Sequence, residues 1–508
     1  MSPHIRVVTT ASGARAVQIV YSRKGGKRDL EHIGSAHTDA ELELLKATAQ
    51  QRLTADQPEL DLDLDGGDPA PKNAPLPISS TRMGPLLDGL DHAYQALGLD
   101  AAADHDEIFR KLVFARLIEP TSKLDSLRVM SEVGLDAPSY RTVTRALPTY
   151  ATEKFRGALS RACAARAGLG PNALVLFDVS TLYFETQEGD GFREPGFSKE
   201  RRLEPQITIG LLTNAAGFPL QLDAFEGNTA ETKTMLPVIN AFRRQYELEH
   251  VTVVADAGML SRQNRVDLDT AGLGYIIGQR LADMPWVLEQ WRKDHPDAPL
   301  EEGMVLTERT YTGTAGARRQ HRIIYQYRAA RARRTLRGID AQIAKAERAV
   351  AGRAQLKRNR FITVTDESRA VNRELEAKAR SLAGWKAYIT NLDEQTASNQ
   401  FVIDAYHQLW HVEKSFRMSK HDLAARPIFH RLKESIDAHL TVVFAALAVA
   451  RQIEAVTGWS LKKFITTARR YREVEITVGG HTVTAADPIP DDLAQALEVL
   501  KQEGTKLT

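Results

Sequence analysis

A series of short apolar runs, beginning after Gly170, constrains the fold of this 508-residue sequence more than any other feature. Three strand-like runs come first: LVLFDVSTLYF, QITIGLLTN and FPLQLDAFEG. A helix at 234–246, a strand at 251–255, a helix at 261–271 and a strand at 275–278 are expected next. Strands that first form a meander and then alternate with helices predict a mixed α/β sheet flanked by helices.

Other patterns divide the rest of the chain, and at about 150 residues per domain several domains are expected. Alternation around two glycine turns predicts strands at 6–10, 16–22 and 28–33, followed by a helix at 39–53. The expected segments are 1–54 (a separate N-terminal β-meander plus helix), 55–84 (an acidic linker rich in proline and glycine), 85–169 (a helical region), 170–280 (the first part of the α/β core), 281–383 (an insertion, β-rich and then basic and helical), 384–475 (the second part of the core) and 476–508 (a C-terminal tail).

Composition excludes several classes of protein. Hydrophobic residues make up 43% and charged residues 26% of the chain, which is typical of a globular protein. The one cysteine, Cys163, excludes an intramolecular disulfide and a cysteine-based zinc site. The start of the sequence lacks a secretory signal pattern. The longest strongly apolar stretch, 438–450, is shorter than the ~20 residues that span a bilayer. We therefore expect a soluble, cytoplasmic protein.

Positive charge is concentrated in two places, although the net charge is only +2. Residues 318–380 hold 18 Lys and Arg against 6 Asp and Glu. Such a stretch can follow a phosphate backbone, but it can equally be a solvated helix surface.

The run SYRTVTRAL places Arg141 and Arg145 on one helix face. It suits either a DNA-recognition helix or, as we favour, a helical bundle with an exposed basic face.

Two aspartates each end an apolar strand. Asp178 follows LVLF, and Asp256 follows VTVVA. Carboxylates at the carboxyl ends of buried strands lie at the sheet edge, where α/β folds place ligand sites. One such aspartate alone is more often a turn or a helix cap. Two of them in the same strand series would repel each other unless a cation neutralised them, which points to a metal site.

The helix YHQLWHVEKSFRMSK offers a third acid. Tyr406, Trp410, Glu413, Arg417 and Lys420 fall at spacings of 4, 3, 4 and 3, which puts them on one helix face. The simpler interpretation is an amphipathic helix with a surface ion pair, worth a few tenths of a kcal/mol. That interpretation explains the charged pair but not the two aromatic residues beside it.

With these features the sequence resembles the DDE transposases of bacterial insertion sequences, in the group with a Y-x2-R-x3-E-x6-K signature. Tyr406, Glu413 and Lys420 match the signature, whereas Leu409 stands at the arginine position. Arg417, one turn beyond Glu413, is a candidate for the missing cation. The runs FDVSTLYFE, QITIGLLTNAAGFPL, EGNTAET and ADAGMLSRQN also resemble this group, so the likeness covers roughly residues 170–450.

The resemblance implies an RNase H-like core with Asp178 on the first strand, Asp256 after the fourth, and Glu413 on a helix after an inserted region. These three carboxylates would be the catalytic residues and the ligands of Mg²⁺, with Mn²⁺ as an alternative. The implied activity is metal-dependent DNA cleavage at terminal inverted repeats, followed by strand transfer into target DNA. Pairing two ends implies a homodimer that acts at the nucleoid.

Further residues are candidates for DNA contact. By resemblance, Tyr406 and Lys420 would contact DNA near the cleaved phosphate, and Arg417 is added as the substitute cation. Lys199 and Arg202, between the first two core strands, either bind phosphate or only solubilise a loop. The two interpretations of this loop remain open.

Several alternatives remain at this stage. The chain is either an active transposase, a catalytically inactive DNA-binding relative, or an RNase H-like nuclease that cuts without joining. Trp286 and Trp291 of the insertion could stack on a displaced base, but buried tryptophans are the favoured interpretation. His407 and His411 are four apart, but zinc is disfavoured because only His411 lies near the Glu413 face.

Overall fold

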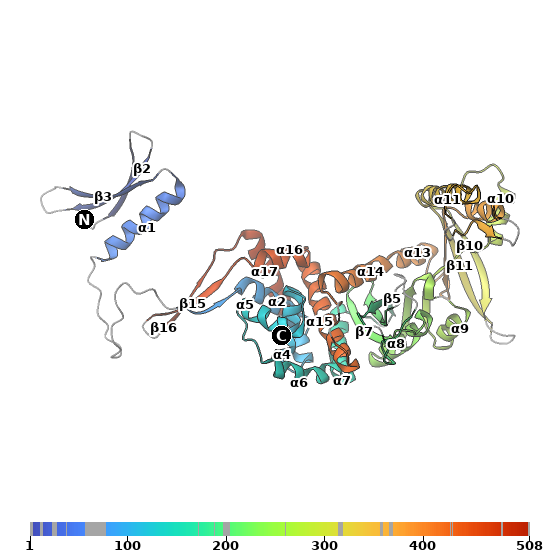
Figure 1. The fold of residues 1–508 in the computed structure, drawn as a ribbon, viewed down its shortest axis with the longest axis horizontal. Helices are drawn as coiled ribbons and strands as arrows, with labels where there is room; N and C mark the ends of the chain where they lie inside the picture. Colours follow the sequence, from blue (N-terminus) through green and yellow to red (C-terminus); the bar gives the residue numbers. More distant parts are fainter. Residues whose placement is uncertain are drawn as a thin grey trace. The chain divides into compact units, whose positions relative to one another are not determined.

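The structure is a computed structural model (Figure 1). The chain forms two compact units, residues 1–75 and 76–508, which are described separately. The residues that the structure describes are 4–10, 14–22, 28–36, 38–55, 78–170, 172–186, 188–196, 204–259, 261–312, 318–355, 359–364, 369–426, 428, 430–478 and 481–505.

The first unit is an antiparallel sheet with one helix packed on it. Its elements are β1 (His4–Thr9), β2 (Arg15–Ser22), β3 (Arg28–Ala36) and α1 (Asp39–Ala55). The strands lie in the order β1-β2-β3, and Val17, Ile19 and Leu42 form a small apolar core with the helix. The meander and helix predicted from the sequence are confirmed. Most of the predicted linker, residues 56–77, lies outside the described residues.

The centre of the second unit is an eight-stranded mixed sheet. Its strands, in their spatial order, are β10 (Val305–Thr312), β11 (Arg319–Tyr327), β14 (Trp385–Thr390), β9 (Gly274–Gln279), β8 (His250–Ala255), β5 (Asn172–Tyr183), β6 (Gln206–Asn214) and β7 (Pro219–Glu226). Strand β8 is parallel to β5, and β9 is parallel to β8, whereas β6 is antiparallel to both β5 and β7. Numbered along the chain, the strands β5 to β9 lie in the order 3-2-1-4-5, which is the RNase H-like order. The predicted mixed α/β fold is confirmed.

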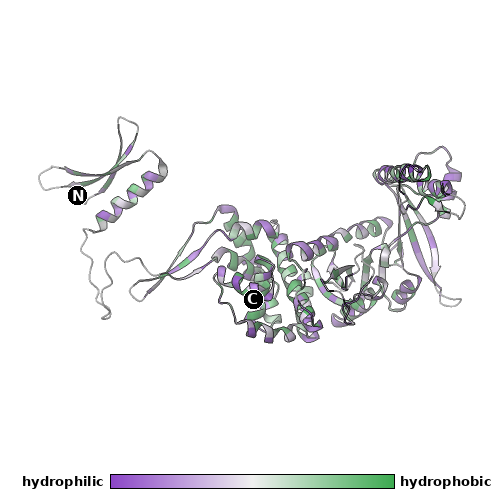
Figure 2. Cartoon of the chain, in the orientation of Figure 1, coloured by the Kyte–Doolittle hydropathy of each residue, from purple (hydrophilic) through white to green (hydrophobic). Residues whose placement is uncertain are grey.

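The insertion and the strand that follows it, β14, lengthen this sheet, and the insertion also adds a small subdomain. Strand β14 pairs antiparallel with β9, and β11 and β10 follow outward. The other elements are α10 (Trp286–Asp294), α11 (Ala329–Val350), β12 (Ile362–Val364), β13 (Arg369–Val371) and α12 (Arg373–Ser381). Ile339, Ile343 and Phe361 form a separate core, against which Leu375 and Ala379 of α12 pack. In Figure 2 helix α11 is mainly hydrophilic.

The tryptophans of the insertion differ from the favoured expectation of burial. Trp286, the first residue of α10, is 67% exposed. Trp291 is partly exposed and stacks on His295 with the ring centroids 5.1 Å apart. The reason is that α10 buries only Leu288, so most of this short helix faces solvent.

Helices cover both faces of the central sheet. They are α8 (Glu231–Gln245) and α9 (Arg262–Thr270) on one face, and α13 (Asn399–His407), α14 (Leu409–Arg417) and α15 (Lys433–Thr457) on the other. The helix that was expected to carry Tyr406, Glu413 and Lys420 is interrupted at Gln408 and ends in a π-helical turn, Met418–Asp422. Side chains of β5 alternate between the two cores, so Phe177 packs on the α8 side and Leu176 on the α14 side.

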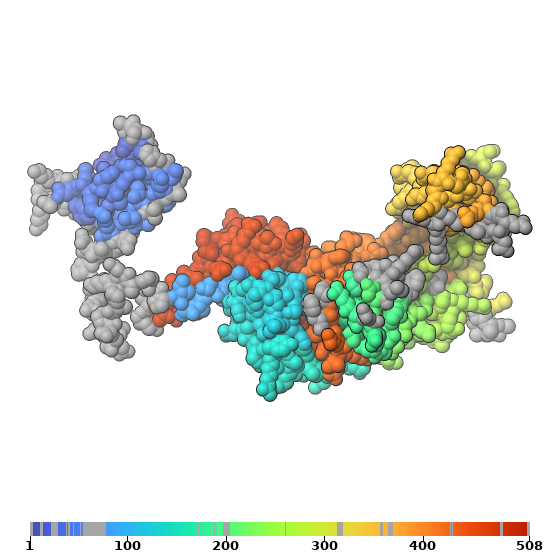
Figure 3. All heavy atoms as spheres, viewed as in Figure 1, coloured from blue at the N-terminus to red at the C-terminus, as the bar shows by residue number. Residues whose placement is uncertain are grey.

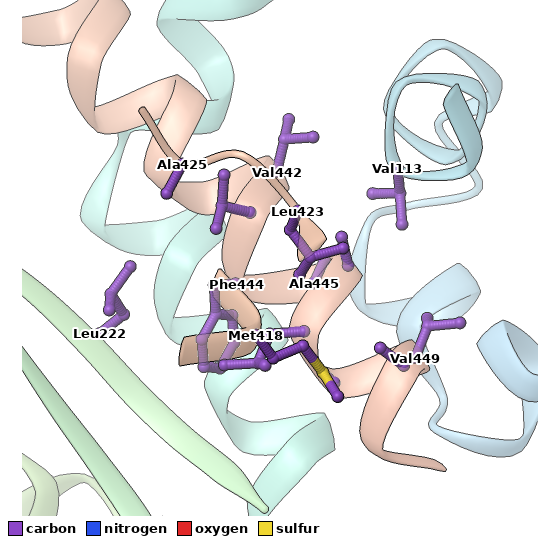
Figure 4. Packing of buried hydrophobic residues seen from close by; sticks show 14 of the residues in the cluster. Val113, Leu222, Met418, Leu423, Ala425, Val442, Phe444, Ala445 and Val449 are labelled. Atoms are coloured by element: carbon purple, nitrogen blue, oxygen red, sulfur yellow. The ribbon is translucent and has the colours of Figure 1, made fainter. Parts of the chain in front are cut away.

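Helix α15 is the central helix of the helical region. It packs against four of the helices before the sheet, which are α2 (Gly84–Ala96), α4 (Glu107–Ile118), α6 (Tyr140–Ala151) and α7 (Glu153–Ala167). Two further helices, α3 (Leu99–Ala102) and α5 (Lys123–Glu132), pack on these four. Figure 4 shows Val442, Ala445 and Val449 of α15 among Val113, Met418 and Leu423. In Figure 3 the atoms of residues 100–170 lie against those of this helix. Arg141 and Arg145 are exposed on α6.

One helix in the described part of the chain, α15, is long and apolar enough to cross a membrane. Within its most apolar window, however, 72% is buried inside the protein. Helix α15 therefore has the burial of a core helix.

The last residues are part of the second unit rather than the tail expected at 476–508. Strands β15 (Glu473–Val478) and β16 (His481–Ala486) form a small antiparallel sheet with β4 (Ile78–Arg82), and α16 (Leu461–Ala468) precedes them. Helix α17 (Asp491–Thr505) packs on α2 and α15 because Leu493 and Leu500 are fully buried.

Candidate active site

Asp178 and Asp256 lie on neighbouring parallel strands. Asp178 belongs to β5, and Asp256 directly follows β8. Phe177 pairs with Ala255, so the two aspartates occupy the next pair of positions in the same register. Because neighbouring strands lie about 4.8 Å apart, residues paired in this way are direct neighbours across the sheet.

The two aspartates belong to the face that α13 and α14 cover. Leu176 and Val254, two residues before each aspartate, are part of the hydrophobic core on that face. Helix α14 packs on β5, and α13 packs on β8 and β9. The segment that carries Tyr406 and Glu413 therefore lies over Asp178 and Asp256. Asp178 was expected at the end of its strand, but it lies within β5, because the pairing of β5 with β6 continues to Tyr183.

Tyr406 connects the helical segment directly to Asp256. Its hydroxyl donates a hydrogen bond to Asp256 Oδ1 at 2.6 Å. Burial raises the pKa of Tyr406, and the bond to Asp256 raises it further, so the hydroxyl remains a donor at neutral pH. Tyr406 is only 5% exposed, which differs from the expectation of a direct DNA contact. Its position is that of a residue that orients Asp256.

Gly278 makes room for the ring of Tyr406. A Cβ atom at Gly278 would lie 2.5 Å from the Tyr406 hydroxyl and 2.9 Å from the nearest ring carbons. Tyr388, which pairs with Gly278 across the sheet, meets Tyr406 edge-on at a centroid distance of 4.9 Å. The glycine and the second tyrosine together fix where the Tyr406 hydroxyl can reach.

Glu413 is exposed on α14, and its charge acts on both Tyr406 and Lys386. The helix is anchored by the turn between β6 and β7, because Ser415 Oγ donates to the carbonyl oxygen of Gly217 at 2.7 Å. Lys414 adds an ion pair with Glu454 of α15 at 2.8 Å. The third acid therefore stands on a helix that is fixed at two points.

Lys386 is a residue of this site that the sequence analysis missed. Its Nζ lies 4.1 Å from the ring centroid of Tyr406 and 5.7 Å from that of Tyr388. Burial lowers the pKa of Lys386, while the charges of Asp256 and Glu413 oppose that shift. The alternation Trp385, Lys386, Ala387, Tyr388 along the strand was the available signal, since it puts Lys386 and Tyr388 on one face.

The three carboxylates offer the hard oxygen ligands that Mg²⁺ and Mn²⁺ prefer. Within the ranges described above, however, no group of three or more His, Cys, Asp or Glu side chains lies close enough together to hold a metal ion. Asp178 and Asp256 are brought side by side, and Glu413 is exposed on the covering helix. The carboxylate oxygens are the right kind of ligand for a divalent cation. In its exposed position, however, Glu413 does not complete a set of three ligands with Asp178 and Asp256.

The remaining signature residues have different surroundings. Leu409 is 8% exposed and belongs to the apolar core, so a hydrophobic side chain replaces the signature arginine. Arg417 is exposed on α14, and Lys420 is partly exposed in the π-helical turn. Lys199 and Arg202 lie outside the described residues.

A basic cavity lies where β5 ends, at Tyr183, and none of the three carboxylates lines it. It has a volume of about 880 Å³ and includes Lys420 in its lining. Arg426 contributes as well, with its guanidinium 4.8 Å above the ring of Tyr183, the last residue of β5. The other lining side chains include Arg193, Arg431 and the acids Glu185 and Glu188. The lining is thus more basic than acidic.

The two histidines of this helical segment, His407 and His411, have different surroundings. His407 approaches the Tyr388 hydroxyl at 3.4 Å, whereas His411 stacks on Trp410 with the ring centroids 3.8 Å apart. Burial lowers the pKa of both histidines. The two rings therefore have separate aromatic partners.

The sequence and the structure of this chain were compared with protein-family models, curated proteins and solved structures. A family model described as a transposase DDE domain matches residues 170–449, more than half of the chain. No curated protein matches the sequence. Among solved structures, the chain is similar to a piggyBac transposase in a synaptic complex with hairpin DNA. The identity is 10%, the TM-score is 0.35, and the match covers 75% of this chain and 70% of that one. By its matching domain, this chain belongs to the family of DDE transposases, which act in DNA transposition.

Proposed function

We propose that this transposase cleaves DNA at the terminal inverted repeats of an insertion sequence and joins the freed 3′ ends to target DNA. The observation that supports the proposal is that Asp178 and Asp256 directly follow the paired residues Phe177 and Ala255, beneath the helix that carries Glu413. Carboxylates collected on one face of an RNase H-like sheet suit phosphodiester chemistry with divalent cations.

Asp178, Asp256 and Glu413 would hold Mg²⁺ or Mn²⁺, with Glu413 turning inward from its exposed position. When bound, such ions activate the attacking oxygen and stabilise the leaving oxygen. Tyr406 keeps Asp256 in one orientation through its hydrogen bond. One set of side chains would thus serve both water attack at the element end and attack by the 3′-hydroxyl.

DNA would contact the basic groups around this site. Lys420 and Arg426 line the cavity where β5 ends, and Arg417 is exposed on α14. Lys199 and Arg202 remain further candidates for phosphate contact. Along α11, the exposed side chains of Arg333, Arg334, Arg337 and Arg348 would follow the backbone of the terminal DNA. Two ends held together imply a homodimer, acting at the nucleoid.

The test is end cleavage under single-turnover conditions with Mg²⁺ or Mn²⁺, on DNA that carries the element's own inverted repeats. Asp178→Asn, Asp256→Asn and Glu413→Gln should each abolish cleavage while DNA binding persists. The matched control is Glu249→Gln, because Glu249 is exposed at the opposite end of β8 from Asp256. Cleavage near the wild-type rate in any of the three variants would refute the role of that acid.

The alternatives give different results in the same system. A catalytically inactive relative would bind the ends but would not nick them with either metal. A nuclease would cut the ends but would not join pre-cut ends to a target plasmid. Joined products from pre-cut ends therefore separate a transposase from both alternatives.

A further inference from the structure

The helix that carries Glu413 lacks the cation that the family signature places there. Leu409 occupies that position in the apolar core, where it leaves no polar group. A phosphodiester that approaches Asp256 and Glu413 meets negative charge. The divalent cations proposed for this site would offset part of that charge, and a further positive group close to both acids would stabilise the charge of the phosphate.

Strand β14 brings such a group to the same face of the sheet. The ammonium of Lys386 lies over the ring of Tyr406, whose hydroxyl is bonded to Asp256. Asp256 and Glu413 are both close enough to act on the charge of Lys386. Arg331 at the start of α11 adds a second positive charge nearby, since it acts on Lys386 and on Tyr388.

Among the described residues, aromatic rings rather than hydrogen-bond acceptors surround the ammonium of Lys386. In the described part of the chain, Lys386 forms neither an ion pair within 4.0 Å nor a hydrogen bond. Its contacts are the faces of two tyrosine rings, which hold a cation by attraction to the ring. The side chain is partly exposed, so its three N–H donors are available to an anion.

We propose that Lys386 is a catalytic residue that binds the scissile phosphate, supplying from strand β14 the positive charge that the signature arginine supplies from the helix. This inference rests on the proposed function, DNA cleavage at the site of Asp178, Asp256 and Glu413. The competing candidate, Arg417, is exposed on α14 and is not among the groups that act on Tyr406 or Lys386.

The first test compares single-turnover cleavage rates at saturating metal ion and DNA. Lys386→Met should lower the rate by roughly 100-fold or more, as expected for the loss of one stabilising charge. Lys386→Arg should restore it to within about tenfold. The matched control is Lys463→Met. Lys463 is on α16, outside the site, and its Nζ also lies over an aromatic ring, 3.6 Å from the ring centroid of Trp459. A wild-type rate for Lys386→Met, or an equal loss for Lys463→Met, would overturn the proposal.

The second test removes the phosphate charge instead. DNA ends with a single methylphosphonate at the scissile phosphate or at either neighbour are cleaved by wild type and by Lys386→Met. The methylphosphonate at the scissile phosphate and the Lys386→Met substitution each lower the cleavage rate by some factor. If Lys386 binds that phosphate, the combined factor will be smaller than the product of the two, because both changes remove the same contact. Fully multiplicative losses, or coupling seen only with Arg417→Met, would contradict a contact by Lys386.

The proposed function and this inference fail in different ways. If the wild-type protein cuts no DNA end, the proposed function fails. In that case the salt dependence of DNA binding tests whether Lys386 contacts a phosphate. The loss of one phosphate contact lowers the slope of log affinity against log salt by about one. An unchanged slope in Lys386→Met would then exclude the phosphate contact, and thermal melting of each variant shows whether it is folded.

Discussion

At the scale of single residues, the orientation of Asp256 depends on a glycine on another strand. Gly278 leaves space for the Tyr406 ring, Tyr388 supports that ring from the side, and the Tyr406 hydroxyl reaches Asp256 at 2.6 Å. A hydrogen bond to a charged group contributes about 1.5–3 kcal/mol. The chain of contacts gives the buried Tyr406 a place in the proposed active site, where its hydroxyl holds the carboxylate of Asp256.

Tyr406→Phe should lower the cleavage rate or the affinity for metal by about 10–100-fold, because Asp256 loses the group that orients it. Gly278→Ala should have the same effect, since the added Cβ displaces the ring. The double variant should be no worse than the more severe single variant. The measurement is cleavage rate as a function of Mg²⁺ concentration.

Gly170→Ala is the control for this pair, because a Cβ at Gly170 meets nothing within 4 Å. Its metal dependence should match that of the wild type. If Gly278→Ala also matched the wild type, the proposed chain of contacts from Gly278 to Asp256 would be wrong.

At the scale of elements, the position of Glu413 depends on how α14 is held against the sheet. The turn between β6 and β7 touches the helix backbone, because a Cβ at Gly217 would lie 2.8 Å from both the Cβ and the backbone oxygen of His411. Gly217 also has a φ of +79°, in the left-handed region that favours glycine. The turn can therefore pack this closely against α14 only with a glycine at position 217.

Gly217→Ala should destabilise the protein by about 1–3 kcal/mol and lower cleavage, since both backbone strain and a clash with α14 result. Gly303→Ala has nearly the same φ, +82°, but a Cβ there meets nothing within 4 Å. Denaturant unfolding and end cleavage measured on both variants separate strain from contact. Equal effects of the two substitutions on cleavage would show that the contact with α14 does not matter.

Two buried histidines, His430 just before α15 and His439 within it, make the stability of the fold depend on pH. Burial lowers the pKa of His430 to about 4 and lowers that of His439 well below its usual value. Arg116 and Lys123 act on both rings in the same direction, and His439 Nε2 donates to the Ala425 carbonyl oxygen at 3.1 Å. Both rings are therefore neutral in the folded protein near pH 6.

Because the unfolded chain binds these protons and the folded chain does not, the unfolding free energy should fall as pH drops from about 6.5 to 4. The slope is up to about 1.4 kcal/mol per pH unit for each histidine. His439→Gln should reduce this slope, whereas His481→Gln on the exposed strand β16 serves as the control. Urea unfolding at several pH values gives the result, and an unchanged slope in His439→Gln would contradict it.

At the scale of the whole molecule, the basic insertion should be a DNA-binding surface that extends the active site. Replacing Arg333, Arg334 and Arg337 by alanine should weaken DNA binding and lower its salt slope by up to about 2.7, or about 0.9 per phosphate contact. Arg380→Ala is the control, because Asp340 and Glu376 already neutralise Arg380 in the same subdomain. Equal salt slopes for the triple variant and the wild type would exclude α11 from DNA binding.

Much of this architecture was predictable because its signals are local. The strand series after Gly170, the end of β8, and the meander of the first unit follow from alternation and from glycine and proline, whereas β5 continues beyond its expected end at Asp178 to Tyr183. The placement of Asp178 and Asp256 on neighbouring strands follows from the predicted RNase H-like order, which the observed strand pairing confirms.

The rest depends on contacts between distant segments. Lys386 joins the site only because β14 pairs with β9, an antiparallel pairing that no local pattern indicates. The interruption at Gln408 buries Tyr406 while Trp410 is 55% exposed, although both were predicted on one helix face. No glycine or proline marks that interruption, so packing against the sheet rather than local sequence determines it.

The central claim is that Asp178, Asp256 and Glu413 form one metal-binding active site. A crystal structure with Mn²⁺ and a DNA end, solved with anomalous scattering from manganese, tests it most directly. We predict anomalous peaks about 2.0–2.6 Å from carboxylate oxygens of all three residues, with Glu413 turned inward. Manganese bound elsewhere, or any one of the three acids directed away from it, would contradict the account.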